Sequence, residues 1–145
     1  MTGGYRLSFD RADMQVDAIH TFLAQSYWAE HIPLAIVERA IAGSLCVGIF
    51  APGGEQVAFA RVVTDRATFA YLADVYVLES HRGHGLAARM VTALHDHADL
   101  QGLRRWMLAT SDAHGLYAGL GWTAVEDGKP FMQRHFPGVY GRPRQ

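Results

Sequence analysis

The stretch that decides the fold is Asp74-Val-Tyr-Val-Leu-Glu-Ser-His-Arg-Gly-His-Gly-Leu-Ala87, which has the pattern of a strand entering a helix through a glycine-rich turn. Gly83 and Gly85 allow the chain to turn tightly. The first N–H groups of a helix have no partner within the helix and lie at the positive end of its dipole. The turn therefore predicts an anion site, with Arg82 and Arg89 adding positive charge. The alternative is a simple tight turn with solvated arginines.

Hydrophobic patterning on both sides of this stretch predicts a mixed α+β fold in the order β α α β β β α β α β β. The expected helices run from Val16 to about Ser26, from Pro33 to Gly43, from the glycine turn to Gly102, and from Ala113 to Leu120. The expected strands are 5–9, Leu45–Ala51, Gln56–Thr64, Thr68–Leu78, Arg104–Ala109, Trp122–Val125 and Met132–Phe136. The result is a mostly antiparallel mixed sheet of about seven strands, flanked by four helices. The strand after the long helix should be parallel to the one before it.

Length and composition predict one domain over residues 1–145 in a reducing compartment. The 145 residues are 50% hydrophobic, and 13 basic against 14 acidic residues give a formal charge of −1. This balance argues against a broad surface for nucleic acid or anionic membrane. The single cysteine, Cys46, lies in an apolar run and is expected to be a small buried apolar residue. With one cysteine, neither a disulfide nor a zinc site is expected. No signal-peptide pattern or membrane-length apolar run is present, so a cytoplasmic protein is expected.

The segment GHGLAA also fits a G-x-G-x-x-A dinucleotide fingerprint, which would indicate a nucleotide-dependent oxidoreductase. That fingerprint normally opens the first βα unit of a parallel sheet. Here three strands with hairpin-length links come first, and too little chain follows for a doubly wound sheet. The oxidoreductase is therefore the least favoured function.

Two motifs together resemble the GNAT family of N-acetyltransferases. Arg82-Gly-His-Gly-Leu-Ala87 matches that family's R/Q-x-x-G-x-G/A signature, and Leu116-Tyr-Ala-Gly-Leu-Gly-Trp122 is similar to its second signature. The order of elements also fits, so the resemblance covers nearly the whole chain. It implies direct transfer of acetyl from acetyl-CoA, as co-substrate, to a primary amine of a small molecule or peptide, and a possible homodimer. An acyl-CoA-binding sensor without efficient transfer is the alternative.

The resemblance implies a cofactor cleft between the strand that ends at Val77 and the strand that ends near Ala109. Backbone groups at Tyr76 and Val77 would hold the pantetheine arm and polarise the acetyl carbonyl, and amides of residues 82–87 would hold the pyrophosphate. Thr110 stands where many members have an asparagine that contacts the cofactor arm. The cofactor residues carried over are Tyr76, Val77, Arg82, Gly83, His84, Gly85, Leu86, Ala87, Arg89 and Thr110.

Tyr117 occupies the place of the family's usual general acid, although its helical spacing also fits a core aromatic. Asp74 interrupts an apolar strand, where a carboxylate is costly unless it is paired or functional, so it is the first candidate for the general base. Glu79, His114, a water or no base at all are the alternatives.

The acceptor is expected on an aromatic wall with nearby charges, which would suit an amine or cation. The candidate acceptor residues are Tyr27, Trp28, Glu30, Arg61 and Tyr71. Tyr27 and Trp28 could instead close the core beneath their loop.

Overall fold

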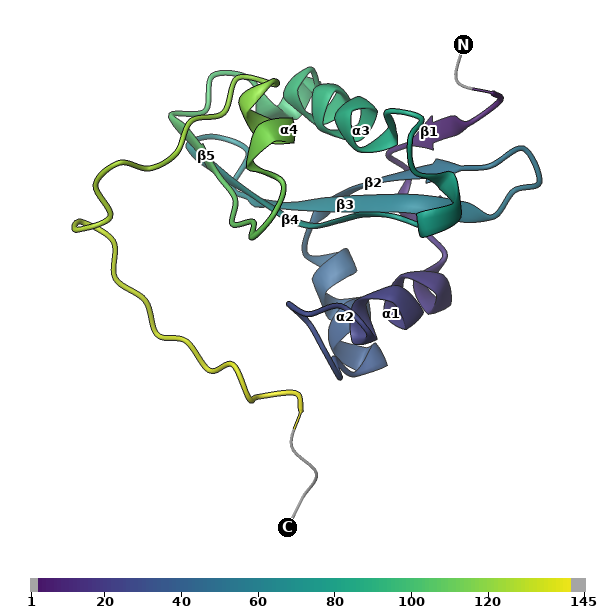
Figure 1. Cartoon of the computed structure of the whole chain (residues 1–145), viewed down its shortest axis with the longest axis horizontal. Helices are drawn as coiled ribbons and strands as arrows, with labels where there is room; N and C mark the ends of the chain where they lie inside the picture. The colour runs from purple at the N-terminus through teal and green to yellow at the C-terminus, as the bar shows by residue number, and fades with distance from the viewer. Residues whose placement is uncertain (1–2, 142–145) are drawn as a thin grey trace.

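A five-stranded sheet in the order β1-β2-β3-β4-β5 forms the centre of the molecule. The computed structural model describes residues 3–141, so the ends of the expected domain, 1–2 and 142–145, lie outside the described residues. The strands are β1 (Arg6–Ser8), β2 (Leu45–Phe50), β3 (Gln56–Thr64), β4 (Phe69–Val77) and β5 (Arg105–Met107). The helices are α1 (Val16–Ala24), α2 (Leu34–Ala42), α3 (Leu86–His95) and α4 (His114–Ala118), with short 3-10 turns at Arg11–Asp13, Glu79–His81 and Ala98–Leu100. Helices α1 and α2 cover one face of the sheet, and α3 and α4 lie on the other (Figure 1).

The pairing of the strands follows the predicted meander and crossover. Strands β1 to β4 are antiparallel to their neighbours, and β5 pairs in parallel with β4. The turn between β3 and β4 is built on Asp65, whose Oδ1 accepts N–H hydrogen bonds from Ala67, Thr68 and Phe69 at 2.9, 2.8 and 3.2 Å. The mixed α+β architecture with a mostly antiparallel sheet, expected from the sequence, is thereby confirmed.

Each face of the sheet has its own buried cluster, as the helical spacing predicts. On one face Ile19 and Leu23 of α1 and Val37 of α2 pack against Phe59. On the other face α3 buries Leu86, Met90, Val91 and Leu94 against β2, β3 and β4. Helix α2 starts directly after Pro33 and ends at Ala42, with Gly43 as its C-cap, one residue inside the expected bounds at each end. Within residues 3–141 no helix has both the length and the apolar character needed to cross a bilayer.

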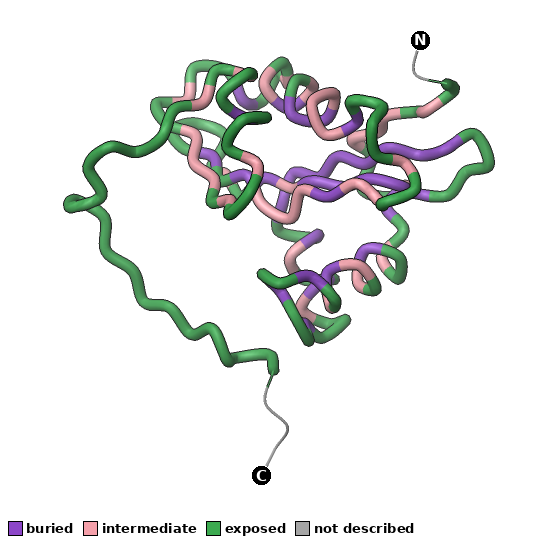
Figure 2. The backbone as a smooth tube through the Cα atoms, in the orientation of Figure 1, coloured by how far each residue is buried: buried purple, intermediate pink, exposed green. Residues whose placement is uncertain are grey.

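The two C-terminal strands expected at Trp122–Val125 and Met132–Phe136 do not form, so the prediction of about seven strands was wrong by two. Trp122 packs on Trp106 and Tyr117 and donates its Nε1–H to His95 Nε2 at 3.1 Å. It therefore belongs to a side-chain cluster rather than to a sheet. Residues 123–141 are exposed throughout and form no helix or strand (Figure 2). Their alternating apolar residues find no core surface to pack on, and alternation alone does not stabilise a strand.

A bulge in β4 and an early end to its pairing with β5 create the site. Phe59 pairs with Tyr76, whereas Arg61 pairs with Ala73, so two residues of β4 oppose one of β3. Asp74, one of the two, has a left-handed φ of 56°. Pairing between β4 and β5 stops at Tyr71, and the last six residues of β4 leave that edge open.

Candidate functional site

A cavity of about 800 Å³ lies where β4 and β5 part. Its walls come from β4, the glycine turn, the β5–α4 segment, α4 and the α1–α2 loop. Most of the candidate residues line it: Tyr27, Trp28, Arg61, Tyr71, Asp74, Tyr76, Val77, Arg82, Gly83, Gly85, Leu86, Ala87, Thr110 and Tyr117. Its volume is typical of a ligand site.

Three candidate residues do not line the cavity. The exposed carboxylate of Glu30 lies 3.9 Å from His31 Nε2. The His84 ring is tilted against Tyr5, and Arg89 donates from Nη1 to the Tyr5 carbonyl at 3.0 Å. The candidate bases Glu79 and His114 also lie outside the cavity lining.

The glycine turn has the backbone needed for an anion. Gly83 and Gly85 have φ values of 86° and 70°, in the left-handed region that favours glycine. Helix α3 begins at Leu86, and Gly85 precedes it without a side-chain cap. The N–H groups of residues 83–87 therefore lie beside the cavity at the positive end of a ten-residue helix, with no acceptor among the described residues.

The end of β4 leaves one backbone N–H directed into the gap beside β5. The Leu78 N–H donates to Val57 on β3 at 2.8 Å. Because successive residues of a strand point their N–H groups to opposite sides, the N–H of Val77 points toward the open edge. Arg82 Nε donates to the carbonyl of Val77 at 2.9 Å and so ties the strand end to the turn.

Asp74 is the centre of a half-buried polar network. Its Oδ2 accepts from Arg61 Nε at 2.6 Å, and its Oδ1 accepts from Trp28 Nε1 at 2.8 Å. The Arg61 and Asp74 side chains are only 20% and 10% exposed. Arg61 Nη1 also donates to Ser44 Oγ at 3.1 Å. Asp74 thus fixes Trp28, from the α1–α2 loop, against the sheet.

Aromatic rings form the wall on the side of α1. Phe22 stacks on Tyr76 with ring centroids 3.9 Å apart, and Tyr27 meets Trp28 edge-on at 5.1 Å. Burial, and secondarily the Asp74 charge, raises the pKa of Tyr76. Ser111 Oγ donates to the Tyr27 hydroxyl at 2.7 Å, which joins this wall to the β5–α4 segment.

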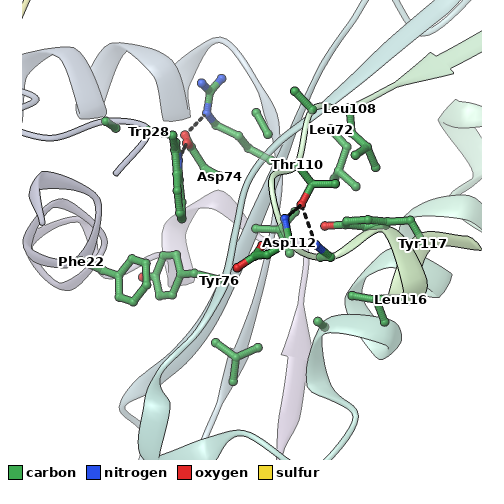
Figure 3. Close-up of a pocket in the computed structure, with 18 of the residues that line it drawn as sticks. Phe22, Trp28, Leu72, Asp74, Tyr76, Leu108, Thr110, Asp112, Leu116 and Tyr117 are labelled. Carbon is green, nitrogen blue, oxygen red and sulfur yellow. Dashed lines mark hydrogen bonds and ion pairs between the residues drawn. The ribbon is translucent and has the colours of Figure 1, made fainter. Parts of the chain in front are cut away.

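Tyr117 projects from α4 toward Asp112 and Thr110 (Figure 3). It is 8% exposed, and its hydroxyl has no hydrogen-bond partner within the described part of the chain. Burial, then the Asp112 carboxylate and Tyr27, raises the pKa of this phenol. The hydroxyl therefore stays protonated at neutral pH and has a proton to donate.

Thr110 holds the segment that carries these groups. Its Oγ1 accepts from the N–H of Asp112 and from the N–H of Ala113, at 3.4 and 3.1 Å. The short segment between β5 and α4 is thereby given a defined path along the cavity.

Several cavity residues were not selected from the sequence as site residues, among them Phe22, Asp112 and Tyr140. Phe22 shares the helical spacing of the α1 core, and Asp112 lies just before helix α4, where an aspartate commonly caps a helix, so neither local pattern points to a cavity. Tyr140 carries no local signal. No group of three or more His, Cys, Asp or Glu side chains that could hold a metal occurs among the described residues.

Comparison with known proteins agrees with this geometry. The model of the acetyltransferase (GNAT) family matches residues 12–122. A "Putative acetyltransferase" of Gibberella zeae is 35% identical over 137 residues, covering 79% of this chain and 76% of that protein. A GNAT-family crystal structure from Xanthomonas campestris pv. campestris is 51% identical with a TM-score of 0.92, and the match covers 95% of this chain and 97% of that one.

A more distant structure shares the fold. Glucosamine-6-phosphate N-acetyltransferase from Arabidopsis thaliana has a TM-score of 0.69 at 18% identity, over 91% of this chain and 98% of that one. The family match spans the elements that build the cavity, from α1 to Trp122. The chain therefore belongs to the GNAT family of acetyltransferases.

Proposed function

We propose that the protein is an acetyl-CoA-dependent N-acetyltransferase that modifies a primary amine of a small molecule or peptide. The observation that carries this proposal is the continuity of one cavity. It joins the anion-binding turn at 82–87, the protonated phenol of Tyr117 and an aromatic wall. A cofactor bearing phosphates at one end and a thioester at the other fits this sequence of environments.

The donor end of the cavity supports acetyl-CoA binding through the main chain. When bound, acetyl-CoA supplies an activated acetyl thioester. The free N–H groups of residues 83–87 would hold its pyrophosphate. The N–H of Val77 would polarise the acetyl carbonyl. Thr110 Oγ1 already accepts hydrogen bonds from two backbone N–H groups. Its hydroxyl hydrogen is therefore left to donate a hydrogen bond to the pantetheine arm.

Tyr117 is proposed as the general acid. A departing thiolate needs a proton, and a phenol whose pKa is raised by burial retains one at neutral pH. The ring packs against Trp122 with centroids 5.9 Å apart, so a substitution that keeps the ring removes only the hydroxyl.

The acceptor end favours an amine with an apolar or flat arm. Phe22, Tyr27, Trp28 and Tyr76 supply ring surface. The charges of Arg61 and Asp74 are already paired with each other. We therefore propose Asp74 as the residue that positions Trp28. A role for Asp74 as the base remains a prediction, as do a homodimer and a cytoplasmic location.

The test is a CoA-release screen over arylalkylamines, polyamines, aminoglycosides, amino acids and peptides, together with calorimetry of acetyl-CoA and NAD(P). We expect acetyl-CoA binding and transfer to an arylalkylamine or a similar apolar amine. Tyr117→Phe should lower kcat about 10²- to 10⁴-fold with little change in acetyl-CoA affinity. Binding without transfer to any amine would indicate a sensor, and absence of acetyl-CoA binding would refute the proposal.

A further inference from the structure

Two carboxylates, those of Asp74 and Asp112, line the cavity. Of these two, only the carboxylate of Asp112 has no partner among the described residues. Both oxygens of Asp74 accept hydrogen bonds, from Arg61 and from Trp28. The Asp112 backbone N–H donates to Thr110 Oγ1, but its carboxylate makes no hydrogen bond or ion pair within residues 3–141. Asp112 is also exposed, so water solvates it while the cavity is open. An acceptor that displaces this water must supply a partner for the charge.

Asp112 lies where the acceptor nitrogen must arrive. In Figure 3 it stands between Tyr76 on the aromatic wall and Tyr117 on α4. Its charge is close enough to contribute to the raised pKa of the Tyr117 phenol. The amine has to reach the same place, because Tyr117 is proposed to protonate the sulfur at the reacting thioester.

An alkylamine arrives at neutral pH as an ammonium ion, which is charged and cannot attack a carbonyl. Entering an aromatic cavity, this ion loses hydration and gains stability from a nearby carboxylate. The carboxylate of Asp74 is already occupied, because it accepts hydrogen bonds from the guanidinium of Arg61 and the indole of Trp28. The exposed carboxylate of Asp112 is in addition open to water, to which a proton can be released.

We infer that Asp112 binds the ammonium group of the acceptor and takes its proton as the general base. The inference rests on the proposed function, because it concerns the same cavity.

One proton passes from the ammonium nitrogen to the Asp112 carboxylate and then to solvent. The neutral nitrogen attacks the carbonyl carbon, so a C–N bond forms and the C–S bond breaks. Tyr117 gives its proton to the leaving sulfur and regains one from the nitrogen of the product amide. The net products are the acetamide, CoA thiol and one proton.

The experiment compares two acceptors of the same shape, 2-phenylethylamine and O-benzylhydroxylamine, in which oxygen replaces the carbon beside the nitrogen. The first is protonated at neutral pH and requires a base, whereas the second is already neutral. We expect Asp112→Asn to lower kcat/KM for 2-phenylethylamine about 10²-fold or more, and for O-benzylhydroxylamine less than about tenfold. Asp112→Glu should recover part of the lost activity. Asp17→Asn, which removes an exposed carboxylate of α1 outside the cavity, should change neither acceptor.

Equal losses on both acceptors would overturn the inference, because a structural defect does not depend on the charge of the nitrogen. Full activity of Asp112→Asn on 2-phenylethylamine would overturn it as well. So would an acceptor-dependent loss in Asp74→Asn with none in Asp112→Asn. These three outcomes leave the proposed function standing, since the wild type still transfers acetyl. Failure of the wild-type protein to bind acetyl-CoA refutes both.

Discussion

Replacing Arg61 by methionine tests whether the Asp74 network holds the aromatic wall of the cavity in place. The substitution keeps an unbranched apolar side chain on β3 but leaves the Asp74 carboxylate, 10% exposed, without its cation. Breaking a buried pair from one side costs about 3–5 kcal/mol, because the remaining charge is desolvated and uncompensated. Asp74 keeps its hydrogen bond from Trp28 at 2.8 Å, so the lower end, about 3 kcal/mol, is expected.

The assay is urea unfolding followed by tryptophan fluorescence, with a thermal melt in parallel. A loss of about 3 kcal/mol corresponds to a melting temperature about 6–12 °C lower for a chain of this size. Adding Asp74→Asn to Arg61→Met should recover about 1–2 kcal/mol, because a buried amide costs less than a buried unpaired charge. Asparagine also tolerates the left-handed φ of 56° at this position.

The matched control is Arg66→Met, which removes the exposed ion pair between Arg66 and Asp99, whose side chains are 45% and 52% exposed. Such surface pairs contribute about 0–1 kcal/mol. If Arg61→Met cost no more than this control, or if Asp74→Asn made the double variant less stable still, the reasoning about the network would be refuted.

Three further predictions concern the glycine turn, the thiol and the Trp122 cluster. Gly85→Ala, at φ 70° with open space around the new Cβ, should cost about 1–2 kcal/mol and weaken acetyl-CoA binding by calorimetry. Gly54→Ala, at φ 98°, should cost a similar amount and leave that affinity unchanged, and equal affinity losses would contradict the assignment of the turn. Burial raises the pKa of Cys46 to about 11, so a disulfide reagent should label this thiol at pH 8 only on unfolding, and rapid labelling of the native protein would be the opposite result. Burial lowers the pKa of His95, which accepts a hydrogen bond from Trp122 at Nε2, so the unfolded chain binds the proton more readily. The free energy of unfolding should therefore fall as the pH drops below about 6.5, and His95→Gln should flatten that dependence in melts from pH 5 to 8.

Local patterns in the sequence were sufficient for most of the fold. Apolar residues at helical spacing placed α1, α2 and α3, and β3 has the predicted bounds. Helix α3 nevertheless ends at His95 rather than near Gly102, because a 3-10 turn at Ala98–Leu100 takes up the last part of the pattern. The C-terminal segment shows the limit of such patterns, since a strand also needs a partner edge and a surface to cover.

The site was only partly predictable, because its decisive contacts join residues far apart in the chain. The glycine turn is contiguous, so its left-handed glycines and the start of helix α3 directly after them could be predicted from spacing alone. By contrast, Trp28 and Asp74 are 46 positions apart, and Tyr27 and Ser111 are 84 apart. No periodicity encodes those contacts. The sequence identified Asp74 as unusual but could not show that both of its oxygens accept hydrogen bonds.

Tyr27 belongs to the α1–α2 loop and Ser111 to the segment between β5 and α4, and their 2.7 Å hydrogen bond, here called the latch, joins these two segments beside the cavity. A single neutral hydrogen bond contributes about 1 kcal/mol, so the latch would be closed only about five times as often as it is open. Within residues 3–141, no other hydrogen bond between these two segments has to break when the latch opens. In the proposed acetyl transfer, entry of a bulky acceptor and departure of its product would therefore cost only the loss of this one weak contact.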